Sequence, residues 1–206
     1  MYNVILDVDG TLLMWRDVFI SWLKKHNLVD EVDPTDYNFS SIKIPGCENA
    51  SIQANSEFRN MLSRLFNESY YLNRLPPIAG AVSVIRSLQN MGCRFTVVSS
   101  YTDNYEAMKS REENLVNVFG PIFEDIVSLP LHSSKTEWLS KQDKNSIFIE
   151  DSVAHIKDAI SVGFDINNCF LIPHAYNYND WLKTIINGER LQRMFWNEIL
   201  TTIRGF

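Results

Sequence analysis

The 206-residue sequence has little cysteine, no excess of basic residues and no long apolar run, and each absence excludes a class of protein. Its three cysteines, Cys47, Cys93 and Cys169, are odd in number and far apart. They therefore indicate neither a disulfide framework nor a zinc site. This cysteine usage fits a reducing compartment, and we expect a cytoplasmic protein.

Charge and hydropathy narrow the choice of partners. The formal net charge of -6 and the pI of about 5.2 do not favour binding to a nucleic-acid polymer or to anionic lipid. No apolar run approaches the ~18 residues that cross a bilayer. The start, Met1 to Leu6, carries no basic region of the kind found in signal peptides. We expect a soluble monomer or homodimer whose partner is a small molecule.

Short β-rich apolar runs alternate with amphipathic helical stretches along the chain. This rhythm predicts an α/β fold, a Rossmann-like parallel sheet covered by helices. The predicted strands cover residues 2–7, 94–99, 124–128, 146–150 and 168–172, and helices are predicted over 80–91, 104–118, 134–141 and 152–162. The spacing of apolar residues from Trp181 to Ile186, and again from Leu191 to Leu200, predicts two more helices on the core.

About 85 residues separate the first two strands, far more than one crossover helix requires. Apolar residues at helical spacing from Trp15 to Leu23 and from Phe58 to Phe66 predict two amphipathic helices there. A polar stretch over residues 29–57 is expected to join them as a loop. We therefore predict a small helical cap over residues 14–75, inserted into a core of residues 1–13 and 76–206.

Acidic residues follow two of the predicted strands. Asp7 ends the first strand, and Asp9 points to the same side if the extended geometry persists, while Gly10 permits a sharp exit. Ligands bind at this carboxyl end of strands in open α/β sheets. Neighbouring carboxylates repel unless a cation lies between them, and a hard ion such as Mg²⁺ suits oxygen ligands. Glu150 and Asp151, after another strand, complete the predicted metal site.

The remaining predicted site residues suit a phosphate group. Ser99 and Ser100 end a third strand and offer hydroxyl donors to phosphate oxygens. Lys135, close to a predicted helix start, supplies a point charge on a flexible stem.

In order and spacing, these residues resemble the four motifs of the haloacid dehalogenase (HAD) superfamily of phosphotransferases. The matching segments are Asp7-Val8-Asp9-Gly10-Thr11, the strand ending at Ser99, Lys135, and Glu150-Asp151-Ser152. The resemblance implies that Asp7 is the nucleophile and Asp9 the general acid and base. It also implies Mg²⁺ held by Asp7, the backbone carbonyl of Asp9 and Asp151, with Glu150 beside them.

A looser resemblance is to the 5'(3')-deoxyribonucleotidase branch of that superfamily. It depends on Tyr70-Tyr71-Leu72, Pro77 to Ala81, Arg111 to Pro121, His174 to Asn177 and Trp196 to Leu200. It implies a nucleoside monophosphate substrate, with Trp15 stacking on the nucleobase and Arg111 on the substrate side. Thr11, Met14 and Glu150 depart from the usual residues of this branch.

Several alternatives stay open at this point. Trp15 at helical spacing also fits packing within the cap. A phosphosugar or phosphoglycolate phosphatase of the same superfamily would need polar cap residues facing the site. A catalytically silent binding domain would keep the fold without the reaction, and a polynucleotide end-processing enzyme would need a basic groove.

Overall fold

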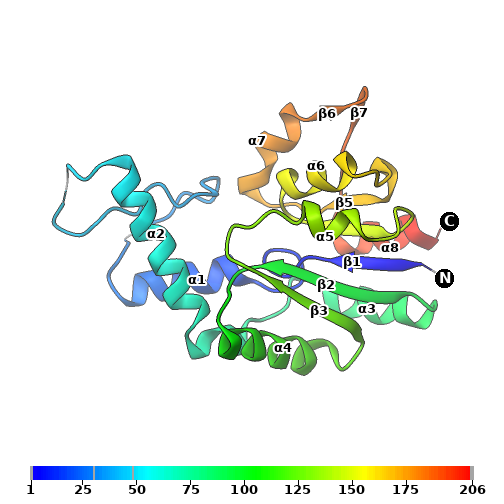
Figure 1. Ribbon diagram of the computed structural model, residues 1–206, viewed down its shortest axis with the longest axis horizontal. Coiled ribbons are helices and arrows are strands. Elements are labelled where there is room, and N and C mark those ends of the chain that lie inside the picture. The colour runs from blue at the N-terminus through cyan, green and yellow to red at the C-terminus, as the bar shows by residue number, and fades with distance from the viewer. Residues whose placement is uncertain (1, 30, 48, 205–206) are drawn as a thin grey trace.

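The computed structural model describes residues 2–29, 31–47 and 49–204. A six-stranded parallel sheet, in the order β3-β2-β1-β4-β5-β8, forms its centre with helices on both faces (Figure 1). The first five strands are β1 (Asn3–Leu6), β2 (Arg94–Ser100), β3 (Phe123–Leu129), β4 (Ile147–Glu150) and β5 (Cys169–Leu171). The predicted α/β fold and all five predicted strands are confirmed. Residues 1, 30, 48, 205 and 206, which fall within predicted core and loop ranges, lie outside the described part.

The two faces of the sheet bury alternate residues of each central strand, as the strand period of two requires. On β1, Val4 and Leu6 join one apolar cluster and Ile5 joins the other. The first cluster includes residues of α3 (Ala81–Asn90), α4 (Tyr105–Phe119) and α8 (Trp196–Arg204), and the second includes residues of α5 (Thr136–Ser140) and α6 (Val153–Ser161). Because both faces are covered, the central strands β1 and β4 are almost continuously apolar.

Helices α1 (Trp15–Lys25) and α2 (Ile52–Asn67) lie beyond the carboxyl end of β1, on the side toward which that strand runs (Figure 1). Their aromatic residues pack against one another and against Phe39 of the connecting segment: the Phe19 ring centroid lies 4.7 Å from that of Trp15 and 5.2 Å from those of Phe39 and Phe66. A 3-10 helix, η1 (Tyr70–Arg74), leads back toward α3. The described helices include none long and apolar enough to cross a membrane.

The carboxyl-terminal region departs from the sequence prediction. After the 3-10 helix η2 (Ile166–Asn168) and β5, the chain forms α7 (Ala175–Lys183), β6 (Ile185–Ile186), β7 (Glu189–Arg190) and β8 (Gln192–Arg193). The predicted helix from Trp181 is wrong beyond Lys183, because Asn187 and Gly188 adopt positive φ and turn the chain into an antiparallel hairpin. The helix predicted from Leu191 begins only at Trp196, since β8 pairs with β5 first.

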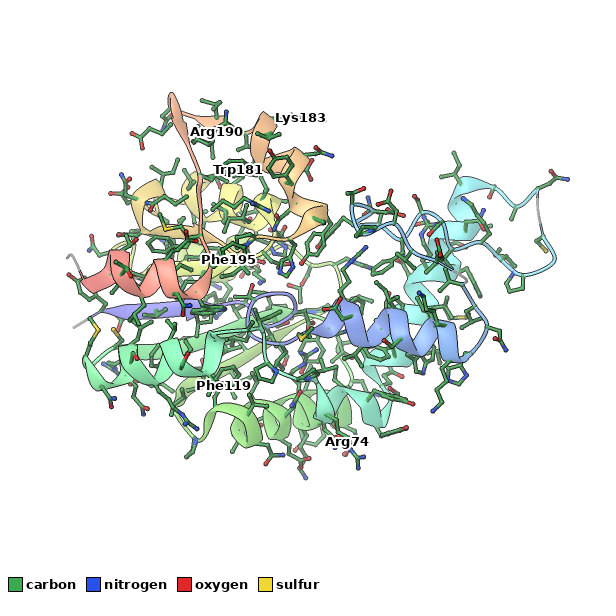
Figure 2. All side chains as sticks on the ribbon, turned by 180° about the vertical axis from the view of Figure 1, so that it is seen from behind. Arg74, Phe119, Trp181, Lys183, Arg190 and Phe195 are labelled. Carbon is green, nitrogen blue, oxygen red and sulfur yellow. The ribbon has the colours of Figure 1, made fainter. Side chains whose placement is uncertain are left out.

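Cation–π contacts hold this hairpin against α7. Figure 2 labels Trp181 of α7 and Arg190 of β7, and the Arg190 guanidinium lies 5.1 Å from the centroid of the Trp181 ring. The guanidinium of Arg193, on the following strand β8, lies 5.5 Å from the centroid of the same ring. The hairpin therefore packs against α7, the helix that follows β5 in the chain.

Candidate active site

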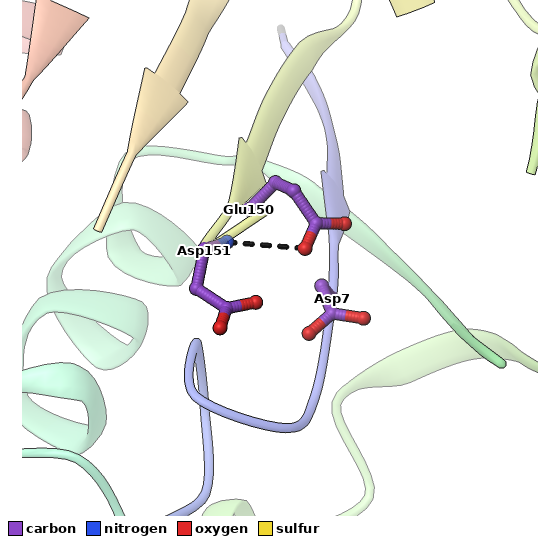
Figure 3. A group of neighbouring side chains, drawn as sticks. All are labelled: Asp7, Glu150 and Asp151. Atoms are coloured by element: carbon purple, nitrogen blue, oxygen red, sulfur yellow. Dashed lines mark hydrogen bonds between the residues drawn. The ribbon is translucent and has the colours of Figure 1, made fainter. Parts of the chain in front are cut away.

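Strands β1 and β4 are neighbours in the sheet, so the carboxylates that follow them meet. Oxygen atoms of Asp7, Glu150 and Asp151 all lie within 4.8 Å of one another (Figure 3). The three residues are buried, with exposed fractions of 5%, 1% and 7%. The structure therefore brings together three of the four acidic residues that the sequence nominated for a metal.

Gly10 lets the chain pass close to this cluster. Its φ is +82°, and a Cβ atom at this position would lie 2.4 Å from Oδ2 of Asp151 and 2.6 Å from the hydroxyl of Tyr176. Both the backbone conformation and the space therefore favour glycine. The Tyr176 hydroxyl donates a 2.5 Å hydrogen bond to Oδ2 of Asp151.

Lys135 is wholly buried between two of the carboxylates. Its Nζ donates to Oδ1 of Asp7 and, at 2.7 Å, to Oε2 of Glu150. The other oxygen of Glu150 accepts from the backbone N–H groups of Asp151 and Ser152, both at 3.1 Å, and Nδ1 of His155 lies 3.3 Å from Oε2. Glu150 is thus the most fully hydrogen-bonded carboxylate of the cluster.

The cluster has more negative than positive charge. Burial, reinforced by the charge of Glu150, raises the pKa of Asp7 to about 7 against the opposing effect of Lys135. Burial and the same neighbour raise the pKa of Asp151 well above its usual range. Burial also opposes ionisation of Glu150, but Lys135 and His155 hold its pKa below the usual range. Three oxygen-donor carboxylates with a single lysine fit a hard divalent cation.

Asp9 lies apart from the three-carboxylate cluster and is bound by Arg111. Nη1 and Nη2 of Arg111 donate to Oδ1 and Oδ2 of Asp9 at 2.5 and 3.1 Å. Arg111 is wholly buried and lies behind Asp9, outside the set of residues that line the adjoining cavity. Burial raises the pKa of Asp9, and the Arg111 charge opposes that rise.

A cavity of about 540 Å³ opens between the strand ends and α1 and α2. Asp9, Gly10, Ser100 and Asp151 form its wall on the sheet side. Among the described residues, the buried Oγ of Ser100 has no hydrogen-bond partner, so it can donate to a bound phosphate oxygen. Ser99, which precedes it, is also buried.

Trp15 both packs within the aromatic cluster and lines the cavity. Its Nε1 donates to Oδ1 of Asn67 at 2.7 Å, and Nδ2 of Asn67 donates to the carbonyl of Tyr101 at 2.9 Å. Asn67 is 1% exposed, so this link between α1, α2 and the end of β2 is buried. The packing interpretation of Trp15 is therefore seen in the structure, and its stacking on a nucleobase stays a prediction.

The sequence reasoning missed most of the cavity wall. Helix α2 contributes a row of polar residues at helical spacing: Ser56, Arg59, Asn60, Ser63 and Asn67. Arg16 lies 5.1 Å from the ring centroid of Tyr176, and both line the cavity. The polar row is visible in the sequence as a period of three to four residues beside the apolar one, and that signal could have identified it.

Several solved structures share this arrangement of strands and helices. No family model matches the chain. A predicted phosphatase from Clostridium acetobutylicum superposes with a TM-score of 0.64 at 16% identity, covering 100% of both chains. A candidate phosphoglycolate phosphatase from Lactobacillus delbrueckii gives 0.64 at 14% identity, covering 98% of this chain and 99% of that one. A candidate HAD hydrolase from Bacillus subtilis, bound to magnesium, gives 0.57 at 14% identity over 97% of both chains. The chain has the HAD fold.

A curated relative is also similar to this HAD-fold chain in sequence. It is an uncharacterised 32.4 kDa protein of Enterobacteria phage T4, 26% identical over 165 residues. The match covers 77% of this chain and 56% of the relative, so the chain spans little more than half of the relative's length. Within the HAD fold of this chain, Asp7 follows the central strand β1, and Glu150 ends the adjacent strand β4.

Proposed function

We propose that this protein is a magnesium-dependent phosphatase that hydrolyses a small phosphomonoester through an aspartyl phosphate on Asp7. The observation that carries the proposal is the buried cluster of Asp7, Glu150 and Asp151, paired with Lys135 beside a cavity that Asp9 lines. Two carboxylates with different partners, one on a lysine and one on an arginine, suit two different chemical roles.

The residues divide the reaction among them. Asp7 attacks phosphorus, and because Lys135 holds its Oδ1, we assign the attack to Oδ2. Asp9 donates a proton to the leaving oxygen and then takes one from the water that hydrolyses the intermediate. Ser99, Ser100 and Lys135 hold the transferred phosphoryl group.

Asp7, Asp151 and the backbone carbonyl of Asp9 would hold Mg²⁺, whose charge would stabilise the phosphoryl oxygens. Glu150 would act beside them, since each of its oxygens already accepts hydrogen bonds from neighbouring groups. Its role in the site is then to hold Lys135 in place.

A nucleoside monophosphate is the substrate class that we propose first. Residues 14–75 act as a cap that selects it, with Trp15 stacking on the nucleobase. Tyr37, Phe39, Tyr101 and Tyr176 also line the cavity, so a flat apolar group finds several aromatic neighbours.

A phosphosugar or a phosphorylated hydroxy acid is the second candidate. The polar row of α2, with Ser56, Arg59, Asn60 and Ser63 on the cavity wall, supports it, because such substrates need hydrogen-bond donors and acceptors from the cap. One protein of similar fold carries the description of a candidate phosphoglycolate phosphatase.

Release of inorganic phosphate tests these assignments. Purified protein is assayed with Mg²⁺ and with EDTA against nucleoside monophosphates, phosphosugars and phosphoglycolate, alongside Asp7→Asn and the exposed control Asp125→Asn. We expect magnesium-dependent turnover that only Asp7→Asn abolishes, with nucleoside monophosphates preferred. Activity in Asp7→Asn would contradict the nucleophile assignment, and preference for phosphosugars would favour the second candidate. Protein inactive on every compound would favour a catalytically silent binding domain.

A further inference from the structure

Arg111 reaches Asp9 across 102 positions of sequence, from the middle of α4 to the turn after β1. Nη1 donates to Oδ1 of the carboxylate and Nη2 donates to Oδ2. This two-point contact fixes the plane of the Asp9 carboxylate as well as its position, which a single bond would not do.

The burial of Arg111 has no evident benefit for stability. Its side chain is 0% exposed, its guanidinium lies 4.8 Å from the centroid of the Tyr101 ring, and its buried Nε has no partner among the described residues. A buried ion pair is often no more stabilising than apolar residues of similar shape, and an unsatisfied buried donor adds a cost. An arginine held at such a cost calls for a role in function.

Contact with the substrate does not supply that role. Asp9 lines the cavity, with a side chain 23% exposed, and both Nη atoms of the wholly buried Arg111 are bonded to its carboxylate. Any group in the cavity therefore meets Asp9 before it meets the guanidinium. The influence of Arg111 on a bound substrate passes through the Asp9 carboxylate.

We propose that Arg111 is a positioning residue that aims the Asp9 carboxyl group at the leaving oxygen of the substrate. This inference rests on the proposed phosphatase function. In the first step an oxygen of Asp7 bonds to phosphorus, the bond between phosphorus and the leaving oxygen breaks, and that oxygen takes the proton of Asp9. In the second step water attacks the phosphorus, gives a proton to Asp9, and releases Asp7 and inorganic phosphate.

The test compares two substrates whose leaving groups differ in their need for a proton. The alkyl phosphate most active in the screen needs protonation of its leaving oxygen, and p-nitrophenyl phosphate does not. Single-turnover rates of phosphorylation are measured for wild type, Arg111→Met, Arg111→Lys and the exposed control Arg94→Met, whose partner is Glu124. We expect Arg111→Met to slow the alkyl phosphate about 100-fold, the scale of a misplaced catalytic group, with little change for p-nitrophenyl phosphate.

Arg111→Lys separates geometry from charge, because lysine keeps the charge and lacks the fork. We expect it to lose most of the rate on the alkyl phosphate. Equal losses on both substrates for Arg111→Met, or a wild-type rate for Arg111→Lys, would overturn the positioning role. Either of these outcomes would leave the proposed phosphatase function standing. Wild-type protein that is inactive on all phosphomonoesters would instead overturn the proposed function, and the positioning role with it, so the two failures can be distinguished.

A second comparison applies if Arg111→Met does not fold. In Asp9→Asn an amide oxygen can still accept from Arg111, although the guanidinium loses its carboxylate, and the double variant Asp9→Asn/Arg111→Met removes both charges of the pair. If Arg111 acts through Asp9, the two variants have the same single-turnover rate, because the group that arginine aims is already gone. A further loss in the double variant would refute the proposal.

Discussion

Lys135 provides the sharpest test of the charge balance at the strand ends. It is wholly buried and bonds to two buried carboxylates, those of Asp7 and Glu150. Replacing Lys135 with methionine keeps much of the side-chain volume and removes the charge. Asp7, Glu150 and Asp151 would then repel one another with no lysine between them.

The expected loss is large on the scale of protein stability. Removing one partner of a buried ion pair costs about 3–5 kcal/mol, because the other charge is left buried and uncompensated. Two carboxylates lose their partner here, so at a pH above the Asp7 pKa of about 7 we expect a loss of about 5 kcal/mol in the metal-free protein, up to the whole stability of an ordinary domain. Mg²⁺ supplies positive charge to the same carboxylates, so it should stabilise Lys135→Met more than it stabilises wild type.

Urea unfolding followed by tryptophan fluorescence measures both effects, once in EDTA and once in Mg²⁺. Lys141→Met is the matched control: Lys141 pairs with Glu137 on the surface, with side chains 67% and 87% exposed, and should lose about 0.5 kcal/mol at most. Lys135→Met/Glu150→Gln should regain part of the loss. A loss below about 1 kcal/mol for Lys135→Met in EDTA, or equal stabilisation of both proteins by Mg²⁺, would refute the reasoning.

Three further predictions concern individual positions. In EDTA, the unfolding free energy should fall as pH rises from about 4 to 7. The reason is that folded Asp7, with its pKa raised to about 7, keeps a proton that an unfolded aspartate with a pKa of 3.8 releases. Urea unfolding across this pH range should show this fall in wild type and a smaller fall in Asp7→Asn. Trp15→Ala should raise KM for nucleoside monophosphates about 10-fold, which lies within the ~1–3 kcal/mol range of base stacking, and should leave KM for phosphosugars nearly unchanged. Equal changes in KM for both substrate classes in steady-state assays would exclude stacking. Gly10→Ala should abolish Mg²⁺ binding in calorimetry, since the new Cβ atom would lie 2.4 Å from Oδ2 of Asp151. Gly46 also has a positive φ, but a Cβ atom there would meet nothing within 4 Å, so the control Gly46→Ala should bind Mg²⁺ normally.

The sheet was predictable because each of its five longest strands carries its own signal. An apolar run such as Ile147 to Ile149, bounded by polar residues, predicts a buried strand wherever it lies in the chain. The hairpin after α7 was missed because Trp181, Leu182, Ile185 and Ile186 fit a helical period. The pair Asn187-Gly188, between two short runs, is a hairpin signal that outweighs that period.

The candidate site was predictable only in part for a related reason. Residues that follow strands, such as Asp7 and Glu150, can be assigned to one edge of the sheet because parallel strands end together. The bond between Arg111 and Asp9 and the bond between Tyr176 and Asp151 join distant segments by side-chain direction alone. No local pattern encodes such a direction, so the partners of the carboxylates became known only from the structure.

The hydrogen bonds of Asn67 restrict how helix α2 can move relative to the sheet. Buried hydrogen bonds join Asn67, at the carboxyl end of helix α2, to Trp15 and to Tyr101. Closer to the amino end of the helix, an exposed 3.1 Å contact joins Asn60 to His132. The exposed bond is the weaker of the two attachments, since water can replace it. We therefore expect α2 to move about Asn67, so that distances measured between labels on α2 and the sheet vary more near Ile52 than near Asn67.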